Sequence, residues 1–223
     1  MDAICSDRAV SGPGQVVVDF ARRGDGRRVG EVFREALPKA DLPGLKAFCG
    51  QVDRHGGMLP MPVGQGRVLV ARVDETVRGA LFLNAPQRWL EEHRPEQREA
   101  LKTLVMEVEA LGVLDGWRGQ GLGSLLMDTA VHAAKGAGSV FLVAKVDAGN
   151  RPVQRWYRKR GFTLLGAGEP LLFSTRFGSD GMEESGSEYR LTARAVDERM
   201  TLRRSQSTHG ATYWEPRRIR SGR

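Results

Sequence analysis

The glycine-rich segment from Leu111 to Ser124 constrains this chain most, because it is typical of a strand that turns directly into a helix. Backbone N–H groups at Gly119, Gly121 and Gly123 can approach an anion without a Cβ in the way. The helix that follows would present the positive end of its dipole at the same place. The segment therefore predicts a site for a ligand that carries a pyrophosphate group.

Two common phosphate-binding motifs do not fit this segment. The dinucleotide fingerprint requires a third glycine three residues after the second, and that position is Ser124. A nucleotide P-loop requires Lys and then Ser or Thr after its last glycine, whereas Gly121 is followed by Leu122. NAD and ATP are therefore both disfavoured as ligands.

The segments around the turn have alternating strand and helix character. An apolar run precedes the turn, a helical spacing of apolar residues follows it, and a second, near-continuous apolar run is typical of a strand buried on both faces. Asn150 and Pro152 then open a short helix that ends at Gly161. The predicted order is strand, glycine turn, helix, strand, short helix and strand, over residues 104–113, 118–123, 122–136, 139–146, 150–161 and 162–165.

Two motifs in this order resemble those of the GNAT superfamily of acyl-CoA-dependent N-acyltransferases. Arg118-x-x-Gly121-x-Gly123 is similar to that family's Arg/Gln-x-x-Gly-x-Gly/Ala signature. Downstream, an Asn, a Tyr seven residues later and a Gly-Phe pair stand where the family has them, at Asn150, Tyr157 and residues 161–162. The resemblance implies an α/β (α+β) fold with a mixed, mostly antiparallel central sheet flanked by helices.

The resemblance also implies acetyl-CoA as co-substrate, no metal, and direct acetyl transfer to a primary amine. No Gly-x-Ser-x-Gly elbow is present for a covalent route. The implied contacts to acetyl-CoA include backbone donors for the thioester oxygen at Leu111, Gly112 and Val113. The structural alternative makes Leu111 and Val113 core residues and Gly112 a bulge, and both roles are compatible because a bulge frees the donors. The remaining implied contacts are Arg118, Gly119, Gln120, Gly121, Leu122, Gly123, Ser124 and Asn150.

Glu107 and Glu109 are the candidate general bases. Strand side chains alternate, so both share one face of the predicted strand with Leu111 and Val113. Burying an unpaired polar group costs on the order of 1–3 kcal/mol. Carboxylates on this strand face are therefore expected either to take part in catalysis or to pair with another group. Glu107 also lies eleven residues before Arg118, which matches the glutamate base of the histone-acetyltransferase branch. The alternative is that these carboxylates face solvent or pair with arginine.

Tyr157 matches the family's general acid, which protonates the departing thiolate. An unperturbed phenol pKa near 10 suits that task at neutral pH. The alternative is a packing role on an apolar face with Val153 and Trp156. Asn150 is either the family's CoA-contacting position or an ordinary helix N-terminal residue.

The first half of the chain predicts further sheet and helix. A strand at residues 15–20 precedes a helix that Pro38 ends, and a second helix spans residues 42–52. Strands at 67–73 and 77–84 form a hairpin around residues 74–76. Residues 85–103 are a charged helical insertion that is a solvated excursion, a dimer contact or a substrate lid.

The region after Leu165 is less regular. Residues 171–175 are interpreted as an extension of the strand before them and 189–195 as the last sheet strand, and the reverse assignment of these two segments is the alternative. Residues 178–187 are interpreted as polar and flexible. The predicted organisation is a flexible N-terminus at 1–14, an N-acetyltransferase domain at 15–196, and a basic, disordered C-terminal tail at 197–223.

Composition limits the class of partner. The 223 residues, 40% of them hydrophobic, can bury one substantial core, and the formal charge of +7 favours anionic partners. Cys5 and Cys49 form neither a disulfide framework nor metal-ligand spacing with any of the four histidines. No membrane span or signal peptide is visible, so a cytoplasmic location is expected.

Three classes of function follow from these observations. The leading one is the N-acetyltransferase, with acetyl-CoA and an amine acceptor, either a small molecule or a protein, as partners. The alternatives are a catalytically silent acyl-CoA-binding sensor and a basic interaction protein recruited through its tail. No membrane is expected as a partner, nucleic acid is disfavoured because no nucleic-acid-binding fold is visible, and a homodimer stays open.

Overall fold

The computed structural model describes residues 15–37, 44–184 and 186–219, which form two compact units. The first unit contains described residues up to 59, together with 66–82 and 110–130, and the second contains the rest. Strands β4 and β5 and helix α5 contribute residues to both units. Elements that begin in the first unit are β1 (Val16–Phe20), α1 (Gly26–Ala36), α2 (Leu45–His55), β2 (Met58–Pro60), β4 (Thr76–Asn84), the 3₁₀ turn η1 (Asp115–Trp117) and α5 (Leu122–Gly136).

The predicted hairpin at the centre of the first unit is confirmed. Strand β3 (Gln65–Val73) is joined to β4 by Asp74 and Glu75, whose φ angles are 48° and 61°. Two positive φ angles define the type I′ turn, whose twist matches that of the flanking strands. On its other side β3 pairs antiparallel with β1, from Val16 opposite Val73 to Phe20 opposite Leu69.

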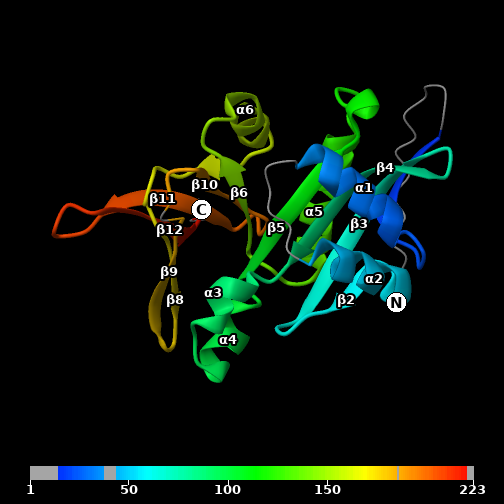
Figure 1. Ribbon diagram of the computed structural model, residues 1–223. Coiled ribbons are helices and arrows are strands. Elements are labelled where there is room, and N and C mark those ends of the chain that lie inside the picture. Colours follow the sequence, from blue (N-terminus) through cyan, green and yellow to red (C-terminus); the bar gives the residue numbers. More distant parts are fainter. Residues whose placement is uncertain (1–14, 38–43, 185, 220–223) are drawn as a thin grey trace. The chain divides into compact units, whose positions relative to one another are not determined.

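Helices α1 and α2 lie against each other in the first unit, because two glycines of α1 have no side chain where α2 approaches (Figure 1). A Cβ on Gly26 would lie 2.1 Å from the Cys49 carbonyl oxygen, and one on Gly30 would lie 2.6 Å from the Cys49 sulfur. The Gly26 N–H also donates to the Asp53 carboxylate at 2.7 Å. The predicted start of the second helix at Leu42 and the end of the first at Pro38 lie outside the described residues.

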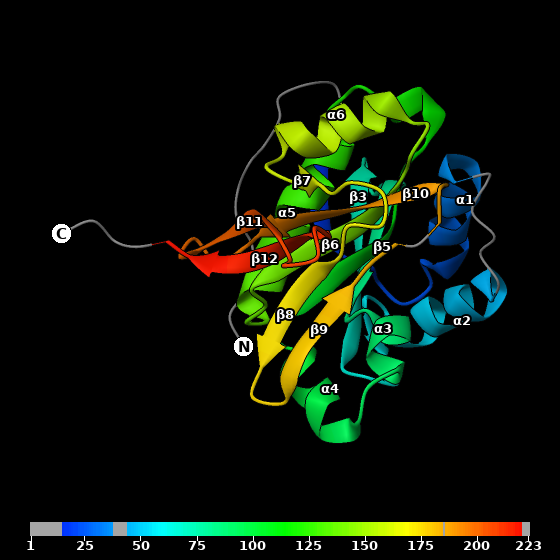
Figure 2. The ribbon, with the colours of Figure 1, turned by 90° about the vertical axis from the view of Figure 1, so that its left-hand side faces the viewer.

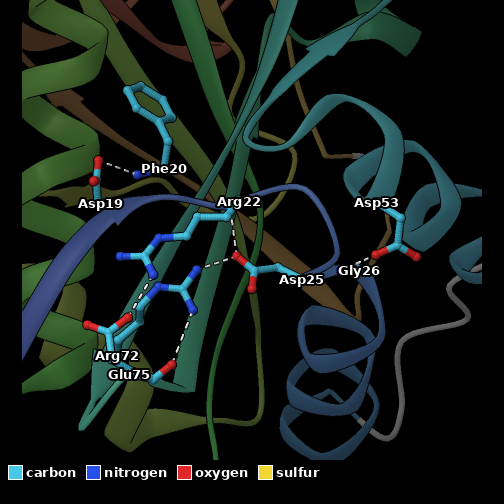
Figure 3. A network of polar contacts seen from close by, with 8 residues as sticks. All are labelled: Asp19, Phe20, Arg22, Asp25, Gly26, Asp53, Arg72 and Glu75. Atoms are coloured by element: carbon cyan, nitrogen blue, oxygen red, sulfur yellow. Dashed lines mark hydrogen bonds and ion pairs between the residues drawn. The ribbon is translucent and has the colours of Figure 1, made fainter.

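A polar network that the sequence did not reveal fixes the chain between β1 and α1 (Figure 3). The buried Arg72 side chain pairs with Asp25, and Asp25 also accepts the Arg22 backbone N–H at 2.5 Å. The Arg22 guanidinium lies 2.7 Å from the Glu75 carboxylate. Removing one partner of a buried ion pair typically costs about 3–5 kcal/mol because a buried charge is left unpaired, so loss of Arg72 or of Asp25 alone should destabilise this entry to α1.

The second unit contains part of the central sheet and the whole of a second sheet. In the first of them β6 pairs parallel with β5 and antiparallel with β10, which also pairs antiparallel with β7. The other sheet has the strand order β11, β12, β8, β9 (Figure 2). The predicted fold class, a mixed and mostly antiparallel central sheet flanked by helices, is confirmed. The elements of this unit are α3 (Gln87–Glu91), α4 (Pro95–Leu101), β5 (Val105–Val113), β6 (Phe141–Asp147), α6 (Arg151–Lys159), β7 (Thr163–Leu164), β8 (Leu171–Thr175), β9 (Gly178–Met182), β10 (Tyr189–Ala195), β11 (Met200–Gln206) and β12 (Thr212–Arg218).

Two predictions for the region after Leu165 are wrong. Residues 171–175 do not extend the preceding strand, because β8 belongs to the second sheet and pairs with β9 and β12. Residues 178–182, predicted to be flexible, are strand β9. The reason is packing: β8 buries Leu171 and Phe173 in the core of the unit, and β9 satisfies its backbone. The last central strand, predicted at 189–195, is confirmed as β10.

The described part of residues 197–223 differs from the predicted disordered tail. Strands β11 and β12 pair over seven residues, from Met200 opposite Arg218 to Gln206 opposite Thr212. Met200 and Trp214 pack on the core of the unit. Glu169 offsets the positive charge of this hairpin by pairing with Arg204 at 2.5 Å and accepting the Trp214 indole N–H at 2.7 Å. Residues 1–14 and 220–223 lie outside the described chain, and the domain boundaries at 15 and 196 stay predictions.

The insertion at residues 85–103 is helical, as predicted, and it is not a solvated excursion. Trp89 of α3 stacks near Phe173 with ring centroids 5.6 Å apart, and its indole N–H donates to the Gly181 carbonyl at 2.9 Å. His93 lies 3.3 Å from the Asp180 carboxylate, which also accepts from Gln97 of α4. The insertion therefore supports the β8–β9 hairpin, which lies beside α4 in Figure 2.

Candidate active site

The glycine turn has the conformation that its glycines predicted. Gly119 and Gly121 have φ angles of 78° and 88°, which side-chain-bearing residues rarely adopt. A Cβ built on either residue would meet no heavy atom within 4 Å, so the backbone there borders open space. Both glycines are therefore required by the shape of the turn, and their exposed backbone is open to a ligand.

The start of α5 leaves backbone donors at this turn. The Gly121 carbonyl accepts the N–H groups of Ser124 and Leu125 at 2.9 and 3.0 Å, which closes the first helical turn. In the described part of the chain, the N–H groups of residues 119–123 donate to no backbone oxygen. Because the first N–H groups of a helix lack an internal acceptor and lie at its positive end, these donors suit an anion.

The Arg118 side chain contacts the backbone and a side chain next to the turn. Its Nε donates to the Val113 carbonyl at 3.0 Å, and its Nη2 lies 2.7 Å from the Asp115 carboxylate. Gln120 adds a hydrogen bond of 3.1 Å to the Gly116 carbonyl. The Arg78 guanidinium stacks over Trp117 at 4.9 Å. The signature residue Arg118 and the nearby Gln120 thus hold η1 and the turn in place, and their contact to a ligand stays a prediction.

Gly112 has a packing reason to be glycine. A Cβ there would lie 2.7 Å from the Ala36 Cβ and 3.1 Å from a Val32 methyl group, so α1 packs directly on β5 at this point. The predicted role of the backbone N–H groups at 111–113 in holding a thioester oxygen is a separate property of the strand and stays a prediction.

Along β5 the two glutamates alternate with buried apolar residues, as predicted. Glu107 is half-buried and Glu109 exposed, while Val108 and Ala110 between and after them are buried. The parallel register places Glu107 opposite Val143 and Val108 opposite Ala144. Both glutamates therefore lie on one face of the sheet in the second unit.

The surroundings of this pair favour the protonated form. The pKa of Glu107 is raised to about 7, first by loss of hydration and then by the negative charges of Glu109 and Glu184. Lys145 and Arg88 act in the opposite direction. Loss of hydration also raises the pKa of Glu109, against the same two cations. A carboxylate with a pKa near neutral pH is suited to act as a general base.

Sequence reasoning missed Lys145 and Glu184. The Lys145 ammonium group lies 3.0 Å from the Glu184 carboxylate, which follows β9. The available signal was a single lysine in the apolar run 139–146, where a buried strand would favour an apolar residue. No sequence signal links Glu184 to this strand.

Asn150 and Tyr157 lie at the two ends of α6. Asn150 is the N-cap residue, and its side-chain oxygen accepts the Val153 N–H at 3.2 Å, so its helix-terminal role is confirmed. Tyr157 is 6% exposed, and its ring contacts Trp156 and Phe162 edge-on at 5.0 and 5.1 Å. Burial raises the pKa of its phenol above the ordinary value, so the hydroxyl keeps its proton at neutral pH. Their roles toward a ligand stay predictions.

Two further classes of site are not found in the described structure. Residues 15–37, 44–184 and 186–219 contain no group of three or more His, Cys, Asp or Glu side chains placed to hold a metal ion. Across the same residues, no helix has the length and apolar character that a membrane span requires.

Part of the chain is similar to one family of known proteins. The model of the Acetyltransferase (GNAT) family matches residues 57–162, which include the glycine turn, both glutamates, Asn150 and Tyr157. Over these residues the chain is similar to the GNAT acetyltransferase family.

Individual relatives are more distant. The chain is 32% identical over 76 residues to a mycothiol acetyltransferase of Corynebacterium glutamicum (strain ATCC 13032), a match over 34% of this chain and 23% of that protein. It thus spans less than a quarter of that relative's length. An acetyltransferase structure from Salmonella typhimurium with acetyl-CoA covers 82% of this chain and 95% of its own, with TM-score 0.55 and 17% identity. A GNAT structure from Elizabethkingia anophelis with acetyl-CoA bound covers 81% and 97%, with TM-score 0.51 and 13% identity. These structures share the fold.

Proposed function

We propose that this chain is an N-acetyltransferase that moves an acetyl group from acetyl-CoA directly to a primary amine. The observation that carries the proposal is strand β5. It bears a carboxylate with a pKa of about 7 and leads into a glycine turn whose backbone donors begin α5. The match of residues 57–162 to the GNAT family model supports acetyl-CoA as the co-substrate.

In this proposal the turn binds the pyrophosphate of acetyl-CoA. The N–H groups of Gly119, Gly121 and Gly123 would donate to it, since the positive-φ glycines leave the approach open. Acetyl-CoA binding would also involve Gln120, Leu122, Ser124 and Asn150 and the donors at Leu111, Gly112 and Val113, and Arg118 would hold the turn.

The carboxylate face of β5 would handle the acceptor proton. Glu107, directly or through water and with Glu109 beside it, takes a proton from the acceptor ammonium group, and the free amine attacks the thioester carbonyl carbon. A new C–N bond forms as the C–S bond breaks. After attack the nitrogen carries one extra proton, which it loses to solvent, and Glu107 passes its own proton to solvent as well. Tyr157 donates its phenolic proton to the departing thiolate and regains a proton from solvent. Of the two protons that the acceptor releases, one therefore ends on the CoA thiol and one stays in solvent.

The experiment is an acceptor screen with the purified full chain. Acetyl-CoA consumption is followed with small amines, aminoglycosides, peptides and compounds related to mycothiol, and acetyl-CoA binding is measured in parallel by calorimetry. The proposal expects micromolar to millimolar binding and at least one acceptor whose turnover is lost in Glu107→Gln. Tight acetyl-CoA binding with no turnover of any acceptor class would instead support an acyl-CoA sensor, and absence of binding would remove both.

A further inference from the structure

We propose that Lys145, held by Glu184, is a positioning residue that sets the proton affinity of the Glu107–Glu109 pair. The proposal rests on the proposed function, because it assigns that pair to proton transfer. It concerns side chains of one unit only, on β5, on β6 and directly after β9.

The register of the sheet places Lys145 beside the pair. Glu107 lies opposite Val143 in the parallel β5–β6 ladder, and side chains two residues apart along a strand share a face. Lys145 therefore lies on the face that carries Glu107, one position further along in the direction of Glu109. Its immediate neighbours Ala144 and Val146 point to the opposite face and are buried.

Glu184 fixes where the ammonium group lies. The 3.0 Å ion pair joins a lysine side chain that is 38% exposed to a carboxylate that is 20% exposed. A lysine on a flexible four-carbon stem has many orientations, so a partner that is mostly buried restricts them. Glu184 also adds a negative charge near Glu107, which means that the two members of the ion pair act on Glu107 with opposite sign.

The charges around the pair show why a cation is needed. Glu107 faces Glu109 from its own strand, Glu184 from the segment after β9, Lys145 from β6 and Arg88 from α3. Two neighbouring carboxylates cannot both ionise easily, and a third carboxylate strengthens that resistance. Without Lys145 the pair would hold its proton to a higher pH, so a smaller fraction of it could accept a proton from the acceptor amine at neutral pH.

The test compares Lys145→Met, Lys145→Arg and Glu184→Gln in the full chain. We expect Lys145→Met to move the acidic limb of the kcat against pH profile upward by about one pH unit, so that the rate below the limb falls about tenfold. Lys145→Arg keeps the charge and should restore the profile. Glu184→Gln removes a negative charge and also frees the Lys145 ammonium group, two effects of opposite sign, so it should move the limb less than Lys145→Met does.

A matched control and a readout without turnover complete the test. Lys135→Met removes the exposed ion pair between Lys135 and Glu198, whose side chains are 57% and 87% exposed, and should leave the profile unchanged. Carbon-13 carboxylate titration by NMR follows Glu107 and Glu109 without any acceptor, so it tests the proposal even if the acetyltransferase proposal fails. Unchanged titration midpoints in folded Lys145→Met, or an equally large shift in Lys145→Arg, which keeps the charge, would overturn the assignment of Lys145.

Discussion

The glycine turn and the carboxylate pair lie at opposite ends of the segment from Glu107 to Ser124, and they acquire their chemistry in different ways. The turn depends on backbone N–H groups and on glycines, which have no side chain to block a ligand, so its properties are set by a few neighbouring residues. The pair depends on charges from α3, from β6 and from the segment after β9, which are distant in sequence. Substitutions in the turn should therefore act mainly on ligand affinity, and substitutions around the pair should act on proton transfer and on pH dependence.

The largest effect is expected at Glu107. Glu107→Gln keeps the shape of the side chain and removes its capacity to accept a proton, so kcat should fall by roughly 10²–10⁴ while acetyl-CoA affinity changes little. Steady-state kinetics and calorimetry on the same preparation measure the two quantities. If the loss appears in Glu109→Gln and not in Glu107→Gln, the base is Glu109. If neither variant loses activity, the acceptor loses its proton elsewhere.

A smaller loss of turnover is expected at Tyr157, at the lower end of the same range, roughly 10². Tyr157→Phe keeps the ring contacts with Trp156 and Phe162 and removes only the hydroxyl, so stability and acetyl-CoA affinity should stay near wild type. The measurement is kcat under conditions in which a solvent isotope effect shows that proton transfer limits the rate. Unchanged kcat there would make Tyr157 a packing residue.

The carboxylate pair should also affect stability. Glu107 has a folded-state pKa of about 7 against an ordinary value of 4.5, so the folded state binds its proton more tightly than the unfolded state. The stability from this proton is fully present below pH 4.5 and is lost as pH rises to 7, by at most about 3 kcal/mol. Glu107→Gln should therefore be more stable than wild type at pH 8 and differ less from it at pH 5.

Urea unfolding at the two pH values measures that difference. Glu198→Gln is the control, because Glu198 is exposed and its pKa is lowered by Lys135, and it should not gain stability at pH 8. Equal stability of wild type and Glu107→Gln at pH 8 would show that the Glu107 carboxylate is hydrated in the folded protein.

The smallest effect is expected in the turn, where Gly123→Ala adds one methyl group. Gly123 lies inside α5, so alanine there should stabilise the helix by up to about 1 kcal/mol and cause no unfolding. Acetyl-CoA affinity should nonetheless fall about tenfold, which is 1.4 kcal/mol, because the Cβ would crowd the bound pyrophosphate. Gly136→Ala makes the same change at the other end of α5 and should not alter affinity. Equal affinities of both variants would contradict the role of the turn in phosphate binding.

The sequence predicted most elements of the family segment because their signals are local. The glycine turn, the apolar face of α5 and the proline that follows Asn150 each act on a few neighbouring residues, and the structure has these elements where they were expected. The second sheet was not predicted. Strand β12 joins β8 through Trp214 opposite Leu171, 43 residues apart, and Glu169 offsets the charge that suggested disorder. Such pairings depend on long-range packing that composition does not report.

The sequence by itself determined where a backbone cradle forms and that two carboxylates share a strand face, because φ preferences and strand alternation are properties of neighbouring residues. Only the tertiary structure decided that Lys145, Glu184 and Arg88 surround that pair, and that Asp25 and Arg72 meet at the start of α1. Proton affinities and ion pairs depend on distance and hydration, and both are set by which strands lie side by side.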